Sequence, residues 1–251
     1  MRLALVTDIH GNLPAFEATL EAIEAAGIET IWCLGDVVGY GADPDACADL
    51  VAERCEICLA GNHDLAVLGE IEVAAFSPSA AEAVSWTRDN CAPWTLDFLR
   101  SLKPAQERDG LGLYHASPRD PIWEYVLTLK VAGECLSAQA QRITFVGHSH
   151  VALHFSTPEA DAETVPASVA VTGSAASPGT TVELGERRWL VNPGSVGQPR
   201  DGDPRAAWLE LDTEAWTATF HRCEYDIDRA AEAIVAAGLP EALGSRLYGG
   251  Q

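Results

Sequence analysis

The first sixty residues alternate between short apolar runs and longer amphipathic segments, and this alternation restricts the possible folds most. The predicted strands cover residues 2–7, 30–34 and 56–60. Phe16, Leu20 and Ile23 recur at helical spacing after the first strand, and Asp43-Pro44 is typical of the start of a second helix, which runs to about Arg54. The order strand, helix, strand, helix, strand predicts a parallel sheet with crossover helices.

The remainder of the chain has a different pattern. Ser77-Pro78 begins a helical region over 77–103, an apolar segment leads to Tyr114, and a last helix is predicted over 228–237. A further strand is predicted over 143–146. After Val151, short strands over 169–171, 181–184 and 189–191 are separated by Gly, Ser and Pro and indicate an antiparallel meander. The strands over 207–211 and 216–221 alternate like those of a hairpin. Since no linker is evident, we expect one domain spanning residues 1–251.

Polar side chains gather where the predicted strands end. Asp8 and His10 are two residues apart, so an extended backbone directs both side chains to the same side, and His148 and His150 repeat this spacing. Open α/β sheets bind ligands at the carboxyl ends of their strands. Seven possible donors follow strand-like runs: Asp8, His10, Asp36, Asn62, His115, His148 and His150.

The chemistry of these donors favours metal binding. Carboxylate, imidazole and amide groups suit Mn²⁺, Fe and Zn²⁺, and the lack of thiolates argues against a structural zinc site. Seven ligands exceed the needs of one ion, whereas two ions that share a carboxylate would use them all. Cys55 and Cys58 form a C-x-x-C pair without a second Cys or His pair; packed, reduced thiols are favoured over redox chemistry.

Charge and hydropathy exclude several classes of partner. The net charge of −21 disfavours general nucleic-acid binding, because few basic side chains are available to replace counterions. No apolar run reaches the ~18 residues of a membrane span. The first residues read as a strand and not as a signal peptide, so a cytoplasmic location is expected. The sequence leaves the oligomeric state open.

The order of these motifs resembles that of the calcineurin-like metallophosphoesterase superfamily, in its small prokaryotic phosphodiesterase-like branch. The resemblance implies an α/β fold in which two mixed β-sheets pack as a sandwich flanked by helices. The motifs that carry it are Asp8-Ile9-His10, Gly35-Asp36, Gly61-Asn62-His63-Asp64, His115, Gly147-His148-Ser149-His150 and Asn192-Pro193-Gly194-Ser195.

The resemblance also implies a role for each motif residue. Asp8, His10 and His150 would bind one metal, Asn62, His115 and His148 would bind the other, and Asp36 would bridge the two. A water or hydroxide between the metals would attack phosphorus. His63 would be the general acid that protonates the leaving oxygen, and Asp64 would orient His63.

The sequence also departs from the related protein serine/threonine phosphatases. The segment from Gly35 to Gly41 lacks their phosphate-clamping Arg, and Asp64 stands in place of their Glu, so that activity is disfavoured. The candidate substrate contacts are Asn12, Arg119, Arg200 and Arg205. For each Arg the alternative is a surface ion pair with a nearby Asp, and for Trp123 and Tyr125 core packing is favoured over stacking on a nucleobase.

These observations favour a metal-dependent phosphoesterase acting on a small phosphodiester or phosphomonoester. Two alternatives stay open: a non-catalytic protein-binding scaffold on the same fold, and a nucleotidase or nuclease for short oligonucleotides. A scaffold has no need of a complete set of donors, and this chain has every one of them, so catalysis is favoured.

Overall fold

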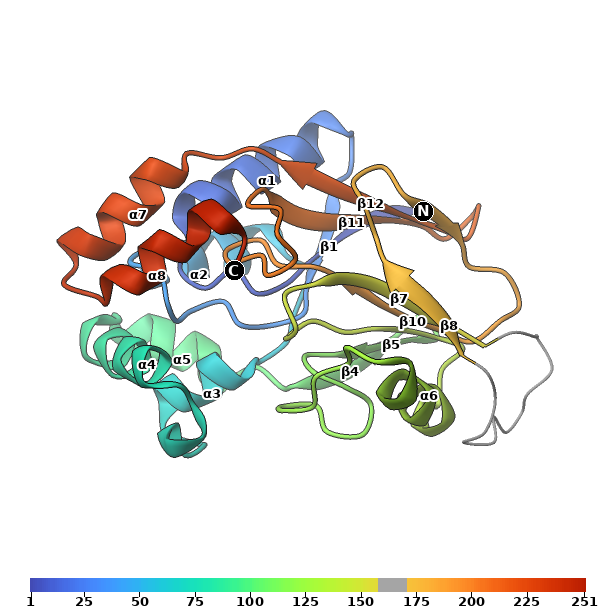
Figure 1. The fold of residues 1–251 in the computed structure, drawn as a ribbon, viewed down its shortest axis with the longest axis horizontal. Coiled ribbons are helices and arrows are strands. Elements are labelled where there is room, and N and C mark those ends of the chain that lie inside the picture. Colours follow the sequence, from blue (N-terminus) through green and yellow to red (C-terminus); the bar gives the residue numbers. More distant parts are fainter. Residues whose placement is uncertain (158–170) are drawn as a thin grey trace.

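Two six-stranded β-sheets pack face to face with helices on their outer sides (Figure 1). This computed structural model describes residues 1–157 and 171–251. The architecture confirms the predicted α/β sandwich of two mixed sheets.

The first sheet contains the three parallel strands predicted from the amino-terminal alternation. Its strand order is β3-β2-β1-β11-β12-β9. β1 pairs in parallel with β2, and β2 with β3, while the other three strands are joined by antiparallel pairing. The strands are β1 (Arg2–Val6), β2 (Thr30–Cys33), β3 (Ile57–Cys58), β9 (Thr181–Glu183), β11 (Ala206–Asp212) and β12 (Thr217–Cys223).

The second sheet has the order β4-β5-β6-β10-β7-β8, with β5, β6 and β10 parallel and the outer strands antiparallel. Its strands are β4 (Ala105–Arg108), β5 (Leu111–Tyr114), β6 (Ile143–Phe145), β7 (Ala152–Ser156), β8 (Thr172–Ala175) and β10 (Trp189–Pro193). The predicted meander is wrong, because β9 and β10 follow one another in the chain but belong to different sheets. The strand predicted over 169–171 lies largely outside the described residues.

The predicted helical region over 77–103 is two helices, because Cys91 and Ala92 are extended before Pro93. None of the helices in the described part of the chain is long and apolar enough to cross a membrane. The α-helices are α1 (Leu13–Ala25), α2 (Pro44–Arg54), α3 (Asn62–Leu68), α4 (Pro78–Asn90), α5 (Pro93–Arg100), α6 (Leu129–Ala138), α7 (Ile227–Ala236) and α8 (Glu241–Ser245); the 3₁₀ helices are η1 (Val73–Ala75) and η2 (Arg246–Gly249).

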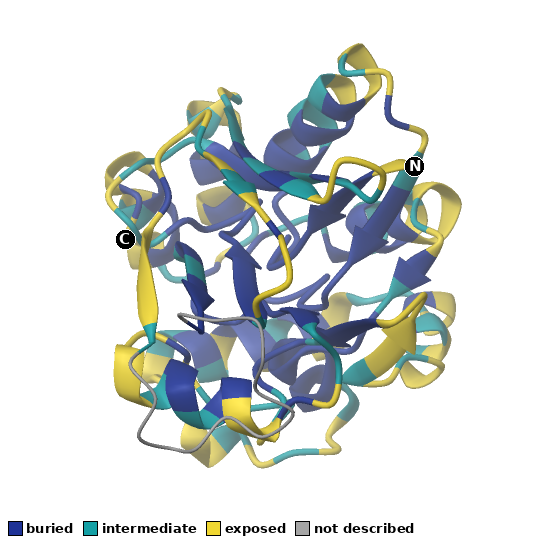
Figure 2. Cartoon of the chain, turned by 90° about the vertical axis from the view of Figure 1, so that its right-hand side faces the viewer, coloured by how far each residue is buried: buried dark blue, intermediate teal, exposed yellow. Residues whose placement is uncertain are grey.

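The alternation of β1 shows how the layers are held together. Leu3 and Leu5 belong to the apolar layer between the two sheets, whereas Ala4 and Val6 face the layer under α1 and α2. All four side chains are fully buried, and Figure 2 shows the central strands as buried, with exposed residues on the helices and edge strands around them. A side chain of Leu size gains about 1.5–3 kcal/mol from such burial. The strand ends are therefore anchored in a rigid core.

Candidate metal centre and adjoining cavity

All seven predicted donors lie directly beyond the carboxyl ends of strands from both sheets. Asp8 and His10 follow β1, Asp36 follows β2, Asn62 begins α3 after β3, His115 follows β5, and His148 and His150 follow β6. Backbone hydrogen bonds join these loops: the Asp8 N–H donates to the Gly35 carbonyl at 2.9 Å, and the Gly147 N–H donates to the His115 carbonyl at 2.7 Å. All seven side chains are buried.

The backbone of this region is strained. Asp8, His10, Asp36, His148 and His150 have φ angles between 52° and 64°, in the left-handed region that non-glycine residues rarely adopt. Such conformations persist only where the surrounding structure imposes them, and they concentrate at functional sites. Five of the seven donors are held in this way.

Three imidazoles share one orientation. The Nδ1–H of each donates to a backbone carbonyl, which leaves Nε2 as the nitrogen with a free lone pair. The donor–acceptor distances are 3.2 Å from His10 to Val38, 3.0 Å from His115 to Leu34 and 2.6 Å from His150 to Gln198.

His148 has the opposite orientation. Its Nε2–H donates to the Trp123 carbonyl at 3.2 Å, so Nδ1 is the nitrogen with the free lone pair. All four histidines are therefore fixed by a backbone carbonyl in the tautomer that a metal ligand requires.

The donor atoms converge in two groups that share Asp36. Asp8, His10, Asp36 and His150 form the first group, and Asp36, His115 and His148 form the second; the ligand atoms of each group lie within 4.8 Å of one another. Asn62 adjoins the second group, with its Oδ1 3.1 Å from His115 Nε2.

Several atoms with free lone pairs lie close together in the first group. His10 Nε2 lies 3.1 Å from His150 Nε2, while Asp8 Oδ1 and Asp36 Oδ2 are buried and have no hydrogen-bond partner in the described part of the chain. Leaving buried carboxylate oxygens unpaired is costly. A divalent cation among these atoms removes that cost, so the residues fit a metal ion.

The pKa values of the two carboxyl groups are shifted by their surroundings. Burial and the nearby carboxylates of Asp64 and Asp8 raise the pKa of Asp36 well above its usual value. Burial also raises the pKa of Asp8, but the neighbouring His150, His115 and His148 together outweigh it, and the net shift is downward. Because cations stabilise the ionised carboxylate, two of them would reverse the upward shift of the Asp36 pKa.

His63 lies beside the donors without belonging to either group. Its backbone N–H donates to Asp36 Oδ1 at 2.8 Å. The centre of its ring is 4.3 Å from that of Tyr40 and 4.9 Å from that of Phe76, and its Nδ1 is buried with no partner among the described residues. Burial, with His150 and Arg200 nearby, lowers the pKa of the imidazole well below 6.5.

The carboxylate of Asp64, which was expected to orient the His63 ring, is bonded to backbone N–H groups. Asp64 Oδ1 accepts the Val38 N–H at 3.1 Å, Oδ2 accepts the Gly61 N–H at 2.8 Å, and no hydrogen bond joins the carboxylate to His63. Burial raises the pKa of Asp64 to about 6. Asp64 instead ties the backbone after β2 to the start of α3, which carries His63.

The ring of His63 occupies space that a side chain at Gly39 would fill. A Cβ atom at Gly39 would lie 2.4 Å from His63 Nδ1, and Gly39 has a φ of +95°. We expect Gly39→Ala to displace the ring and lower kcat at least about tenfold, with a loss of stability of about 1 kcal/mol or more. Kinetics and thermal unfolding of the purified variant would measure both effects.

Gly110→Ala is the matched control for that substitution. Gly110 has a φ of +77°, and a Cβ atom at this position would meet no other atom within 4 Å, so the substitution introduces the backbone strain without a clash. Equal activity of the Gly39 and Gly110 variants would show that the contact with His63 is unimportant.

Only Arg200 of the four predicted substrate contacts reaches the cavity beside the donors. Arg119 forms ion pairs with Glu134 and Glu124 instead. Arg205 forms an ion pair with Asp203 at 2.7 Å, which was the alternative to a substrate contact for this residue.

Asn12, another predicted substrate contact, caps a helix. Its Oδ1 accepts the Ala15 N–H at 3.2 Å as the N-cap of α1, and its Nδ2 donates to the Gly197 carbonyl at 2.8 Å. This side chain is buried and caps α1, and it does not line the cavity beside the donors.

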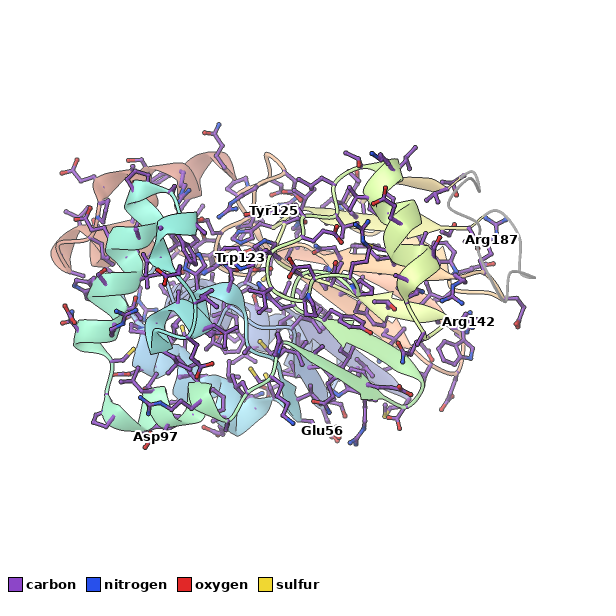
Figure 3. All side chains as sticks on the ribbon, turned by 90° about the horizontal axis from the view of Figure 1, so that it is seen from below. Glu56, Asp97, Trp123, Tyr125, Arg142 and Arg187 are labelled. Atoms are coloured by element: carbon purple, nitrogen blue, oxygen red, sulfur yellow. The ribbon has the colours of Figure 1, made fainter. Side chains whose placement is uncertain are left out.

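The cavity has a volume of about 420 Å³ and opens directly onto both donor groups. Trp123 and Tyr125, for which core packing was favoured, are labelled in Figure 3 and line the cavity. Tyr125 is 47% exposed. The sequence had also given no role to Arg246, because no motif surrounds that residue. The lining residues are Asp36, Tyr40, Asn62, His63, Ala75, Phe76, Ser77, Ala80, Trp123, Tyr125, His148, His150, Arg200, Arg246 and Gln251.

Cys55 and Cys58 lie away from this cavity. Both are free thiols that pack against the core under α2. Burial raises the pKa of Cys55 well above 9.0, and a hydrogen bond with Cys33 together with burial raises that of Cys58. Raised thiol pKa values disfavour the thiolate that redox chemistry needs, in agreement with the packing interpretation.

Comparison with known proteins agrees with the arrangement. Residues 1–214 match the family model described as the calcineurin-like phosphoesterase superfamily domain. The uncharacterised protein MJ0912 of Methanocaldococcus jannaschii is 37% identical over 255 residues, which cover 99% of this chain and 98% of the relative.

Two solved structures are similar over their whole length. A metallophosphoesterase from Sphaerobacter thermophilus has 36% sequence identity and a TM-score of 0.86, with 100% of this chain and 99% of that chain covered. The protein PH1004 from Pyrococcus horikoshii has 18% identity and a TM-score of 0.76, with 100% and 98% covered, which supports the fold alone.

Proposed function

The chain belongs to the calcineurin-like phosphoesterase superfamily, and from this membership we propose that it hydrolyses a small phosphodiester or phosphomonoester with two divalent metal ions. The observation that carries the proposal is the position of Asp36, whose carboxylate belongs to both groups of converging donors. The name of the Sphaerobacter thermophilus relative, a metallophosphoesterase, supports the same class of activity.

In this proposal Asp8, His10 and His150 hold one ion, Asn62, His115 and His148 hold the other, and Asp36 is shared. Nitrogen and oxygen donors without thiolates suit Mn²⁺, Fe or Zn²⁺. When bound, a pair of such ions supplies an activated water molecule and stabilises charge on the attacking and leaving oxygens.

Arg200 is proposed to bind the phosphoryl group that reacts. Its backbone N–H donates to the His150 carbonyl at 3.0 Å, and its Nη2 donates to the Tyr40 hydroxyl at 3.3 Å. No carboxylate in the described part of the chain forms an ion pair with Arg200, so its guanidinium is available to bind a phosphate. Arg200 thereby supplies a cation that the segment from Gly35 to Gly41 lacks.

His63 is proposed to donate a proton to the leaving oxygen. The pKa of its imidazole is held well below 6.5 by burial and by the neighbouring His150 and Arg200. A phosphate ester in the cavity adds negative charge next to the ring, which favours the protonated form. Proton donation by His63 is therefore tied to an occupied cavity.

The shape of the cavity favours a small substrate. A volume of about 420 Å³ is within the range of small-molecule sites. The net charge of −21 disfavours a long polyanion, so a nuclease for short oligonucleotides ranks below the small-ester proposal. A protein-binding scaffold would not need the converging donors, and it ranks last.

Metal removal and reconstitution test the proposal directly. We expect chelation to lower the turnover of aryl phosphate monoesters or diesters at least about a thousandfold, and Mn²⁺, Fe²⁺ or Zn²⁺ to restore it. Since ions bound only by the folded chain stabilise it, we also expect the melting temperature to rise by several degrees on reconstitution. Elemental analysis would give the number of ions bound.

Mg²⁺ is the matched control ion, because it retains its waters and prefers oxygen ligands over imidazole. Full turnover by chelated protein that elemental analysis shows to be metal-free would rule out the proposed chemistry. A chain that takes up ions and hydrolyses none of the esters would favour the scaffold.

A further inference from the structure

Two arginines of this acidic chain face the cavity without a carboxylate partner. Outside the cavity, Arg88, Arg142, Arg187 and Arg188 form no ion pair with a carboxylate, while the eight other arginines do so in the described residues. Arg200 and Arg246 form none there, although acidic side chains outnumber basic ones by 37 to 16. Both of these arginines line the cavity beside the donors.

Arg246 is the less satisfied of the two. It is half-buried, and its Nε and Nη2 are buried without a hydrogen-bond partner among the described residues. Its Cζ lies 4.8 Å from the centre of the Tyr40 ring, while that of Arg200 lies 5.8 Å from the same ring. Burying hydrogen-bond donors on a cation without an acceptor is costly. The arrangement therefore calls for an anion.

The two cations approach the cavity from different parts of the fold. Arg200 follows β10 and is anchored to the backbone of His150, so it lies next to the first donor group. Arg246 begins η2, which follows α8 near the carboxyl terminus (Figure 1). Its guanidinium packs over the ring of Tyr40, whereas Arg200 is bonded through its backbone to the donor His150.

We propose that Arg246, together with Arg200, binds a second phosphate of the substrate, so that the preferred substrates carry two phosphate groups close together. This inference rests on the proposed function, in which the first phosphate is held by the metal ions and Arg200. The fork of guanidinium N–H groups matches two phosphate oxygens, which makes arginine suited to this task. A purely structural cation–π contact with Tyr40 is the alternative, and it leaves Nε and Nη2 without acceptors.

Calorimetric titration of the metal-loaded protein tests the inference. The probes are α,β-methylene-ADP, which carries two phosphate-type groups, and AMP, which carries one, at the same free Mn²⁺ concentration. We expect the wild type to bind the first probe on the order of tenfold more tightly, and Arg246→Gln to remove most of this preference. Arg246→Lys, which keeps the charge and loses the fork, is expected to retain part of it.

Arg205→Gln is the matched control, since Arg205 is paired with Asp203 outside the cavity, and it is expected to leave the preference intact. Bound metal and melting temperature are measured for every variant. An equal loss of affinity for both probes in the Arg246 variants, or no preference in the wild type, would overturn the inference.

The titration separates this inference from the proposed function. If the protein hydrolyses phosphate esters but shows no preference for two phosphates, the function stands and the role of Arg246 falls. If the preference exists and depends on Arg246 while no ester is hydrolysed, the second-phosphate site stands and the catalytic proposal falls.

Discussion

Asp36→Asn is expected to lower kcat/KM by at least about a thousandfold, which corresponds to about 4 kcal/mol of transition-state stabilisation. Asp36 Oδ2 lies 3.5 Å from His10 Nε2 and 3.6 Å from His115 Nε2, so the same oxygen faces both donor groups. The Asn side chain keeps Oδ1, which accepts the His63 N–H at 2.8 Å. The substitution therefore removes the charge at the shared position and preserves the local hydrogen bond.

The expected cause is loss of both ions, so the measurement is metal content together with turnover. We expect the number of bound ions to fall from about two per chain to less than one, since both groups lose the shared carboxylate and the second group then has no anionic donor. Asp97→Asn, on the exposed surface of α5 (Figure 3), is the control for removing one carboxylate. If Asp36→Asn bound two ions and turned over normally, the shared-carboxylate arrangement would be refuted.

The sequence predicted the part of the fold that local periodicity specifies. The amino-terminal strands and helices were found because strand burial and helical spacing repeat within a few residues there. The placement of β9 and β10 in different sheets could not be found in this way, because strand pairing depends on contacts between distant segments. Likewise, Gly61-Asn62-His63-Asp64 was predicted only to follow the strand over 56–60, and the start of α3 at Asn62 was not predicted.

The site was predictable to the extent that its residues follow strands. The residue types and their positions directly after predicted strands were enough to predict all seven donors that the structure brings together. The left-handed backbone of His148 and His150 was not foreseeable, since their spacing suggested an extended segment with both side chains on one side. Arg246 was missed for another reason: no local pattern marks a residue whose significance is an unpaired charge in a folded cavity.

The second large effect is expected at His63. Because this residue contributes no ligand atom to either donor group, His63→Gln should keep the full complement of ions. General acid catalysis typically accelerates a reaction 10²–10⁴-fold, and the benefit is greatest when the leaving oxygen is basic. We therefore expect a loss of kcat of about 10²–10⁴-fold for alkyl phosphate esters.

The dependence on the leaving group separates proton donation from positioning. A p-nitrophenolate ion leaves without a proton, so we expect the loss for p-nitrophenyl esters to stay within about tenfold. His154→Gln, which alters a half-buried histidine of β7 outside the cavity, is the control. Equal losses for both ester classes, with metal content unchanged, would mean that His63 only shapes the cavity. A loss that grows with the basicity of the leaving oxygen requires a proton donor at this position, and among the imidazoles lining the cavity His63 is the one that offers the metal ions no ligand atom.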